Sequence, residues 1–409
     1  MSSMYIERLL EKRLKNAVKF FPAVFVGGPR RSGKTTMVKK IFPRYKYVLL
    51  DELDIRSFAN EDPKGFLEVN APPVIIDEIH NSPNLLPYIK AKIDKNSKPG
   101  QWIITGSQQW TLMKGISETL AGRIAILHLY PFSLTEILKR TKSPPENIKE
   151  LIKYFRQSDN LPKNNLSLEK WILDGGYPEV VFGAKKIKKL WFSSYMQTYI
   201  DRDIRGNIKE ANLRDFERFV RLLAARTSQQ INASNLANDV GVTVPTIKSW
   251  LTLLEASGLI FFLMPYYKNF GKRIIKMPKC YFMDTGLVCY LTGLSNINSS
   301  IYGPMSGALF ETACVSQIYK RLSVFGEENS MYYYRSTDGL EVDIIIENDG
   351  ICYPFEIKLS STINQQHVRN IKKWLDLNKS KQNTGFIISL AKEIKNVAAG
   401  IKNINYLLL

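Results

Sequence analysis

The chain has 409 residues, of which 44% are hydrophobic and 23% charged, and its formal net charge is +19. This composition is that of a globular protein and excludes a disordered, collagen-like or coiled-coil chain; the length predicts roughly two to four domains. The four cysteines are widely spaced, which excludes a zinc ribbon or a disulfide framework. No apolar run reaches the ~18 residues of a membrane span, and the charged N-terminus lacks a signal peptide's apolar core. We therefore expect a soluble, cytoplasmic protein.

The positive charge is concentrated in the first three quarters of the chain. Residues 1–140 and 141–300 each carry a net charge of +9, whereas residues 301–409 carry +1. An excess of Lys and Arg favours a polyanionic partner such as DNA. A lysine-rich surface that serves solubility explains the same excess equally well, so charge alone leaves DNA binding open.

The first predicted elements are a short buried strand at 23–27, a glycine-rich loop and a helix that runs to Ile41. The loop fits the pattern G-x-x-x-x-G-K-[ST] and lies between strand and helix, as a phosphate-binding loop requires. Its glycines allow backbone N–H groups to face phosphates, and the helix N-terminus favours an anion. The residues expected to bind ATP are Gly28, Pro29, Arg30, Arg31, Ser32, Gly33, Lys34, Thr35 and Thr36. Lys34 is expected to reach the β- and γ-phosphates during catalysis, and Thr35 to bind Mg²⁺.

Polar residues also follow two further predicted strands. The apolar segment 73–76 leads to Asp77 and Glu78, which is a Walker B pattern. Asp77 is expected to hold Mg²⁺ through water, and Glu78 to orient the attacking water as a catalytic residue. The strand at 101–105 ends near Thr105 and Ser107, and either side chain could lie between the γ-phosphate and the water.

Additional strands at 47–50 and 124–129 complete a set of five buried apolar strands, which predicts a parallel sheet with helices on both faces. The segment Leu120–Arg123, just before the last strand, resembles the arginine-finger position of AAA+ ATPases. That resemblance implies a catalytic Arg123 that acts in a neighbouring subunit, and hence a homo-oligomer. An ordinary arginine that ends a helix and favours its dipole is the alternative.

The middle of the chain predicts a helical region followed by a winged helix. Residues 141–170 read as a linker and an exposed helix, 174–179 as a sharp turn, and 191–208 as a long helix. Helices at 235–240 and 245–257, a strand at 259–264 and a basic hairpin tip at 268–273 follow. In this interpretation Thr246 and Lys248 face a major groove, and the tip contacts phosphates through Lys268, Lys272 and Arg273. A winged helix that only packs against protein is the alternative.

Near the C-terminus, Asp349-Gly350 favours a two-residue hairpin turn. This turn pairs Asp343 with Glu356 and Glu341 with Lys358. Period-two alternation then separates the two faces of the hairpin. The apolar face is predicted to hold Leu340, Val342, Ile344, Ile346, Tyr353, Phe355, Ile357 and Leu359. The other face is predicted to hold the four charged residues.

Directly opposed carboxylates repel each other unless a cation neutralises them, and Mg²⁺ or Mn²⁺ would do so. With Lys358 beside the metal, the set suits phosphodiester hydrolysis. A solvated face whose charges pair with lysines is the alternative. Asp343 and Glu356-Ile357-Lys358 resemble the PD-(D/E)XK nuclease signature, although Val342 replaces the usual proline. The resemblance implies metal ligation by Asp343, Glu356 and the helical Glu311, and catalysis by Asp343, Glu356 and Lys358.

The order of all these motifs resembles the prokaryotic AAA-family ATPases with a C-terminal DUF4143 domain. The resemblance implies an α/β chain of four parts: a P-loop AAA+ domain at 1–140, a helical linker or lid at 141–225, a winged helix at 226–295 and a nuclease-like DUF4143 domain at 296–409. The expected function is Mg²⁺-dependent ATP hydrolysis coupled to a DNA-facing C-terminal half. A metal-dependent nuclease gated by ATP is a second hypothesis for that half, which the sequence leaves open. The alternative is a nucleotide-dependent switch whose C-terminal domain binds protein or DNA without cleavage. The preference for ATP over GTP rests on this resemblance.

Overall fold

A computed structural model describes residues 5–107, 115–116, 118–162, 166–183, 187–204, 213–267, 277–378 and 384–409. The chain divides into two compact units. The first unit comprises Met1–Phe132 and Thr252–Leu259, and the second unit comprises Ser133–Leu251 and Ile260–Leu409. The division into parts at 1–140, 141–225, 226–295 and 296–409 stays a prediction. Among the helices of the described ranges, none is long and apolar enough to cross a membrane.

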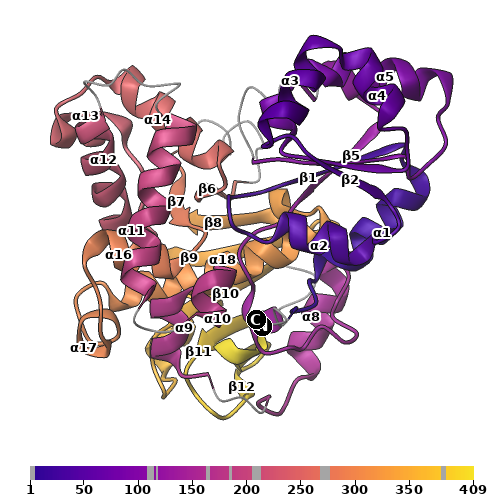
Figure 1. Cartoon of the computed structure of the whole chain (residues 1–409). Coiled ribbons are helices and arrows are strands. Elements are labelled where there is room, and N and C mark those ends of the chain that lie inside the picture. The colour runs from indigo at the N-terminus through magenta and orange to yellow at the C-terminus, as the bar shows by residue number, and fades with distance from the viewer. Residues whose placement is uncertain are drawn as a thin grey trace. The chain divides into compact units, whose positions relative to one another are not determined.

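The first unit is built on a five-stranded parallel sheet, which confirms the predicted sheet. Its strands are β1 Ala23–Gly27, β2 Lys46–Leu49, β3 Val74–Asp77, β4 Trp102–Thr105 and β5 Ile124–His128, in the order β2-β3-β4-β1-β5. Helices lie on both faces (Figure 1): α1 Leu10–Phe20 and α2 Lys34–Ile41 on one, and α3 Leu53–Glu61, α4 Pro63–Val69 and α5 Leu85–Lys95 on the other.

Not all five strands are buried as predicted. The central strands β1, β3 and β4 are buried at every residue, but the edge strands β2 and β5 are partly exposed, because each has a neighbouring strand on one side only. The sheet is parallel, so the carboxyl ends of β1, β3 and β4 lie at one edge. This arrangement brings the glycine-rich loop, Asp77 and Thr105 together.

Residues 133–409 contain most of the helices that the described ranges hold. They are α7 Leu134–Ile137, α8 Ile148–Gln157, α9 Leu168–Asp174, α10 Pro178–Phe182, α11 Lys188–Tyr199 with a π-helical extension at Ile200–Ile204, α12 Leu213–Ala225, α13 Ala233–Val240, α14 Val244–Ala256, α16 Thr285–Thr292, α17 Ile297–Ser300, α18 Ser306–Phe325 and α19 Gln365–Asn378.

The predicted turn at 174–179 packs on the start of α16. Asp284 accepts hydrogen bonds from Gly176 N (2.7 Å) and Leu287 N (3.0 Å), and a Cβ at Gly175 would lie 2.2 Å from its carboxylate.

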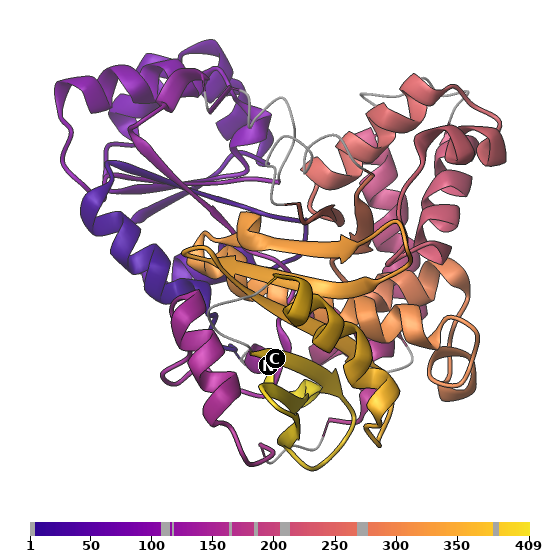
Figure 2. The same cartoon turned by 180° about the vertical axis from the view of Figure 1, so that it is seen from behind.

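The second unit contains an eight-stranded mixed sheet in the order β12-β13-β11-β10-β9-β8-β6-β7. Its strands are β6 Ile260–Pro265, β7 Lys279–Phe282, β8 Met331–Arg335, β9 Glu341–Asn348, β10 Ile351–Lys358, β11 Gly385–Ser389, β12 Lys395–Ala398 and β13 Ile401–Asn405. Helix α19 covers one face (Figure 2), where Val368, Ile371 and Trp374 join the core. On the other face Phe155 of α8 packs edge-on against Phe355 and Phe386.

Helices α13 and α14 follow the predicted order, with a left-handed turn at Gly241 (φ +84°) and Thr246 N donating to Thr243 Oγ1. Strands β6 and β7 pair antiparallel, and β6 also pairs with β8. The predicted hairpin tip, with Lys268, Lys272 and Arg273, lies outside the described residues. The winged helix therefore stays a prediction.

The β9–β10 hairpin has the predicted register, since Asn348 pairs with Ile351 and Ile344 with Phe355. The predicted single apolar face is wrong. The β8–β9 pairing shifts by one residue between Ile345 and Val342, so β9 carries an extra residue there. A bulge of this kind breaks the period-two alternation. As a result Val342 and Ile345 belong to the same core cluster under α19.

Candidate functional site

The Asp77 carboxylate, at the end of β3, accepts hydrogen bonds from three hydroxyl groups. Thr35 Oγ1 donates to Oδ2 at 2.7 Å, Tyr47 Oη donates to the same oxygen at 2.8 Å, and Thr105 Oγ1 donates to Oδ1. Asp77 is only 1% exposed. Three donors stabilise this buried charge and fix its orientation towards the glycine-rich loop. Thr105, one of the two hydroxyl residues predicted after β4, therefore lies in the Asp77 cluster.

The glycine-rich loop is held close to the chain that follows β5. Leu129 N donates to Gly27 O at 2.8 Å, and a Cβ at Gly28 (φ +143°) would lie 2.1 Å from the Leu129 carbonyl oxygen. Gly33 (φ +95°) precedes α2 in a left-handed conformation. Both glycines are required, because the first has no room for a side chain and the second has a conformation that disfavours one.

The other loop residues differ in exposure. Pro29 and Ser32 are buried, Arg30 and Thr35 are half-buried, and Arg31 and Thr36 are exposed. Lys34 is 5% exposed, and its Nζ donates to Gly28 O (3.0 Å) and Pro29 O (2.9 Å). Phosphate oxygens can replace these carbonyl acceptors when a nucleotide binds. The arrangement fits a nucleotide with Mg²⁺, because hydroxyl and carboxylate oxygens, the ligands Mg²⁺ prefers, lie beside the loop.

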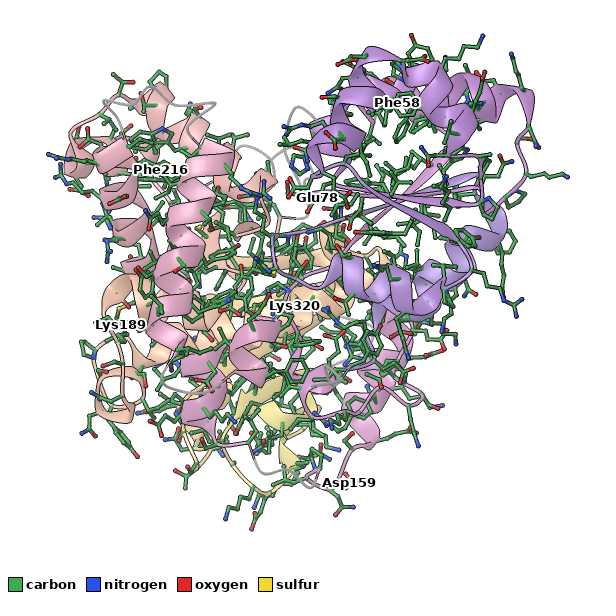
Figure 3. All side chains as sticks on the ribbon, in the orientation of Figure 1. Phe58, Glu78, Asp159, Lys189, Phe216 and Lys320 are labelled. Atoms are coloured by element: carbon green, nitrogen blue, oxygen red, sulfur yellow. The ribbon has the colours of Figure 1, made fainter. Side chains whose placement is uncertain are left out.

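Glu78 lies at the same edge of the sheet (Figure 3) with a left-handed backbone, φ 60° and ψ 47°. Such a conformation is costly for a residue with a side chain. Glu78 Oε2 lies 3.2 Å from His80 Nδ1. Burial raises the pKa of Glu78, but His80, Lys34 and Arg30 together outweigh burial and lower the pKa to about 2. Glu78 is therefore ionised at neutral pH.

Ser107 lies beyond the end of β4 and is 4% exposed. Its Oγ is buried and makes no hydrogen bond within the part of the chain that the structure describes. A buried hydroxyl of this kind is ready to bind a ligand oxygen or water. The predicted contact of Ser107 with nucleotide stays a prediction.

Arg123 lies at the opposite edge of the sheet. It precedes Ile124, which pairs with Ala23 at the start of β1, so roughly 16 Å of strand separates it from the phosphate-binding loop of its own subunit. Arg123 Nε donates to Asp94 Oδ1 at 2.5 Å, and both side chains are about two-fifths exposed. The predicted role of Arg123 in a neighbouring subunit stays a prediction.

Two residues at this site were missed by the sequence reasoning. Arg8, 5% exposed, donates to Ser32 O at 2.8 Å and to Tyr130 O at 2.6 Å, and its guanidinium stacks on Phe132 at 4.5 Å. It thus ties the N-terminal segment to the glycine-rich loop. Tyr47 holds Asp77, and burial and Asp77 raise the pKa of its hydroxyl well above the usual range. The sequence could have pointed to Tyr47, because it lies in a predicted strand of the same parallel sheet as Asp77. It offered no such signal for Arg8, which lies in a charged segment without a motif.

A second cluster of charged residues lies in the second unit. Glu311 of α18 accepts from Tyr281 Oη at 2.6 Å and lies 3.2 Å from Lys279 Nζ. Lys279 Nζ also lies 2.6 Å from Glu341 Oε1. Burial and the neighbouring Asp343 raise the pKa of Glu311. Lys279, which no motif contained, thus joins two of the predicted acidic residues.

Asp343 and Glu356 have their own protein partners. Asp343 Oδ2 accepts from Ile357 N at 2.7 Å, and Glu356 Oε1 lies 2.7 Å from Lys358 Nζ. Burial and Asp343 raise the pKa of Glu356, which is 3% exposed. Over the described ranges, no three His, Cys, Asp or Glu side chains form a group that could hold a metal ion. The ligation by Glu311, Asp343 and Glu356 stays a prediction.

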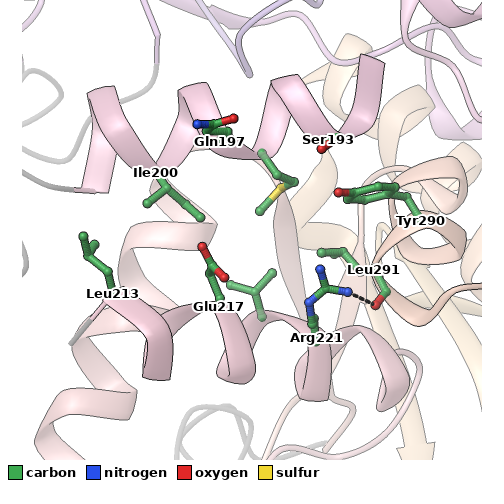
Figure 4. Close-up of a pocket in the computed structure, with 10 residues that line it drawn as sticks. Ser193, Gln197, Ile200, Leu213, Glu217, Arg221, Tyr290 and Leu291 are labelled. Carbon is green, nitrogen blue, oxygen red and sulfur yellow. Dashed lines mark hydrogen bonds between the residues drawn. The ribbon is translucent and has the colours of Figure 1, made fainter. Parts of the chain in front are cut away.

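A pocket of about 350 Å³ lies among α11, α12 and α16 (Figure 4). Its lining is half apolar, with Met196, Ile200 and Leu291. Arg221 of α12 donates to the Leu291 carbonyl oxygen at 3.1 Å across it. None of the residues predicted to carry chemistry lines this pocket.

Comparisons with known families match three segments of the chain. Residues 21–138 match the AAA domain family, 165–298 match a domain of unknown function, DUF8612, and 306–409 match another, DUF4143. The AAA match contains the glycine-rich loop, Asp77 and Glu78, and the DUF4143 match contains Glu311, Asp343 and Glu356.

Similar proteins occur in bacteria and archaea. An uncharacterized protein of Mycobacterium tuberculosis is 28% identical over 368 residues, 88% of this chain and 76% of that protein. One of Methanocaldococcus jannaschii is 22% identical over 367 residues, 85% of this chain and 77% of that protein. A solved Walker-type ATPase of Pyrococcus abyssi is 17% identical, covers 70% of this chain and 96% of its own, and has a TM-score of 0.40. Residues 21–138 are thus similar to AAA domains, and residues 306–409 are similar to DUF4143 domains.

Proposed function

We propose that this protein hydrolyses ATP with Mg²⁺ at the carboxyl edge of the β1–β3–β4 sheet. The observation that carries the proposal is the 2.7 Å hydrogen bond between Thr35 Oγ1 and Asp77 Oδ2. It joins the hydroxyl of the phosphate-binding loop to the Walker B carboxylate, which are the two side chains that hold Mg²⁺ in P-loop enzymes.

The residues around this pair have separate tasks. Bound Mg²⁺ would neutralise phosphate charge, with Thr35 and Asp77 as the groups that hold it. Lys34 exchanges two loop carbonyls for phosphate oxygens. Glu78, ionised because of His80, Lys34 and Arg30, accepts a hydrogen bond from the attacking water and orients it.

The experiment is a measurement of phosphate release by the full chain with ATP, with and without Mg²⁺. Lys34→Ala is expected to abolish the Mg²⁺-dependent release. Lys46→Ala is the matched control, because Lys46 is an exposed lysine of the same unit whose Nζ binds the Val69 carbonyl. Release that survives Lys34→Ala, or that does not need Mg²⁺, contradicts the proposal.

A second candidate function is a nucleotide-dependent switch whose second unit binds DNA without cleaving it. Lys248 is exposed on α14, and residues 141–300 carry a net charge of +9, both of which favour contact with phosphates. The ion pairs of Lys279 within the carboxylate cluster favour binding over cleavage. Duplex DNA binding that weakens with salt and with Lys248→Ala, but not with Lys395→Ala, would support this function. Affinity equal in both variants would contradict it.

A further inference from the structure

Lys279 is a buried lysine that lies among the acidic residues of the DUF4143 domain. It belongs to β7, a strand that precedes the DUF4143 match in the sequence, and it is 4% exposed. Lys279 and Tyr281 are two residues apart on this strand, so they point to the same side. Both contact Glu311 Oε1, at 3.2 and 2.6 Å.

The Lys279 ammonium connects two carboxylates that come from different elements. Glu311 lies on α18 and Glu341 at the start of β9, and Lys279 Nζ lies within 3.2 Å of an oxygen of each. A buried carboxylate needs a positive partner or several donors to stay ionised. Lys279 supplies such a partner to Glu311, whose side chain is 19% exposed, and at the same time to Glu341, whose side chain is 33% exposed.

The remaining carboxylates of the cluster are also engaged by groups of the protein. The Ile357 N–H donates to Asp343, and the Lys358 ammonium contacts Glu356. Together Lys279 and Lys358 carry the same charge as one divalent cation. A divalent cation placed beside them would be repelled by both ammonium groups and would compete with them for Glu311 Oε1, Glu341 Oε1 and Glu356 Oε1. Glu356 Oε2 is buried and makes no hydrogen bond among the described residues, so the exclusion of a divalent cation rests on the two ammonium charges and not on every oxygen being engaged.

We propose that the Lys279 ammonium is the permanent cation of this carboxylate cluster and takes the place of a divalent metal ion. The cluster then holds α18, β7 and β9 together, and the DUF4143 domain acts by binding instead of by metal-dependent cleavage. This inference does not depend on ATP hydrolysis, since it concerns residues of the second unit only.

The test measures Mn²⁺ binding to the full nucleotide-free chain, from the electron paramagnetic resonance signal of free Mn²⁺. The amount of Mn²⁺ bound by the cluster is the difference between the Mn²⁺ bound by a protein and that bound by the same protein with Asp343→Asn. Wild type is expected to bind as much Mn²⁺ as Asp343→Asn does. Lys279→Met is expected to bind one additional Mn²⁺, and the double variant with Asp343→Asn is expected to lose it. Lys402→Met is the matched control, because Lys402 is also a largely buried lysine paired with a carboxylate, Asp159 at 2.9 Å.

Thermal unfolding gives a second readout. Lys279→Met is expected to unfold at a lower temperature than wild type and to recover part of that loss in Mn²⁺. The unfolding temperature of Lys402→Met should be the same in Mn²⁺ and in a chelator. Lys279→Arg, which keeps the positive charge, should behave as wild type in both experiments.

Two results overturn the proposal. The first is Mn²⁺ binding by wild type that Asp343→Asn abolishes, because the cluster then takes a metal with Lys279 in place. The second is a folded Lys279→Met variant that gains no Mn²⁺. If Lys279→Met does not fold, Lys279→Gln replaces it, since the amide can still donate to Glu341 but carries no charge. The comparison of Mn²⁺ binding by wild type and by Asp343→Asn needs neither Lys279→Met nor Lys279→Gln, so it tests the proposal even if both fail to fold.

Discussion

The replacement of Glu78 by Gln tests the chemistry of the nucleotide site most directly. Gln keeps the size of the side chain and one acceptor oxygen, but its other oxygen becomes an NH₂ donor, and the amide cannot accept a proton or polarise water as a carboxylate does. The loss of a positioned general base lowers turnover by roughly 10²- to 10⁴-fold, or about 3–5 kcal/mol of transition-state stabilisation. ATP binding should be retained, because the phosphates are held by the glycine-rich loop and Lys34.

The same substitution has a predictable effect on stability. The pKa of Glu78 falls from 4.5 to about 2 in the folded protein, which corresponds to roughly 3 kcal/mol. Because the folded pKa is the lower one, this stabilisation is present above about pH 4.5 and is lost as the pH falls from there towards 2. Glu78→Gln should therefore be less stable than wild type at pH 7, and the difference should shrink between pH 5 and pH 3.

The assays are phosphate release under saturating ATP, binding of a fluorescent ATP analogue, and urea unfolding at several pH values. Unchanged turnover in Glu78→Gln would refute the role given to this carboxylate. A stability difference that stays constant down to pH 3 would refute the electrostatic account of its pKa. Loss of ATP binding would mean that Glu78 holds the loop and does not act on water.

Four further substitutions test the surroundings of the site. Tyr47→Phe removes one of the three donors to Asp77 and should cost about 1.5–3 kcal/mol in urea unfolding, with a higher Mg²⁺ concentration needed for half-maximal hydrolysis; an unchanged Mg²⁺ requirement contradicts this. Arg8→Lys keeps the charge but loses the planar guanidinium, whose two separate nitrogens reach Ser32 O and Tyr130 O and whose plane stacks on Phe132, so KM for ATP should rise more than kcat falls; equal changes in both would indicate a general structural role. Gly28→Ala places a methyl group 2.1 Å from a carbonyl oxygen and should prevent nucleotide binding; wild-type affinity would mean that the loop can move away. Arg123→Ala should slow hydrolysis by about 10³-fold or more, in an assay whose specific rate rises with protein concentration; a rate independent of concentration and of this change would remove the arginine from catalysis.

The nucleotide site was predictable because its parts are local in sequence. Gly28, Gly33 and Lys34 lie between a buried strand and a helix, and this context determines the conformation of the loop. Asp77 and Glu78 follow a buried strand directly. The alternation of strands and helices predicted a parallel sheet, and since parallel strands end at a common edge, such a sheet brings the two motifs together.

Contacts between residues far apart in the chain were not predictable from these patterns. Arg8 meets Tyr130 across 122 positions of sequence, and the hydroxyl of Tyr47 reaches Asp77 from a neighbouring strand. Neither contact has a spacing that a motif could record. Both became visible only when the order of the strands placed β2 beside β3 and the N-terminal segment beside the glycine-rich loop.

In the C-terminal charged cluster, too, local features were predictable from the sequence and long-range contacts were not. The sequence by itself determined the hairpin turn at Asp349-Gly350 and its register, because a two-residue turn leaves one pairing. Only the tertiary structure decided which faces the side chains occupy, because the extra residue in β9 depends on its pairing with β8. Only the tertiary structure brought Lys279 to Glu311 and Glu341, because the charge that a buried carboxylate needs can come from any strand that packs against it.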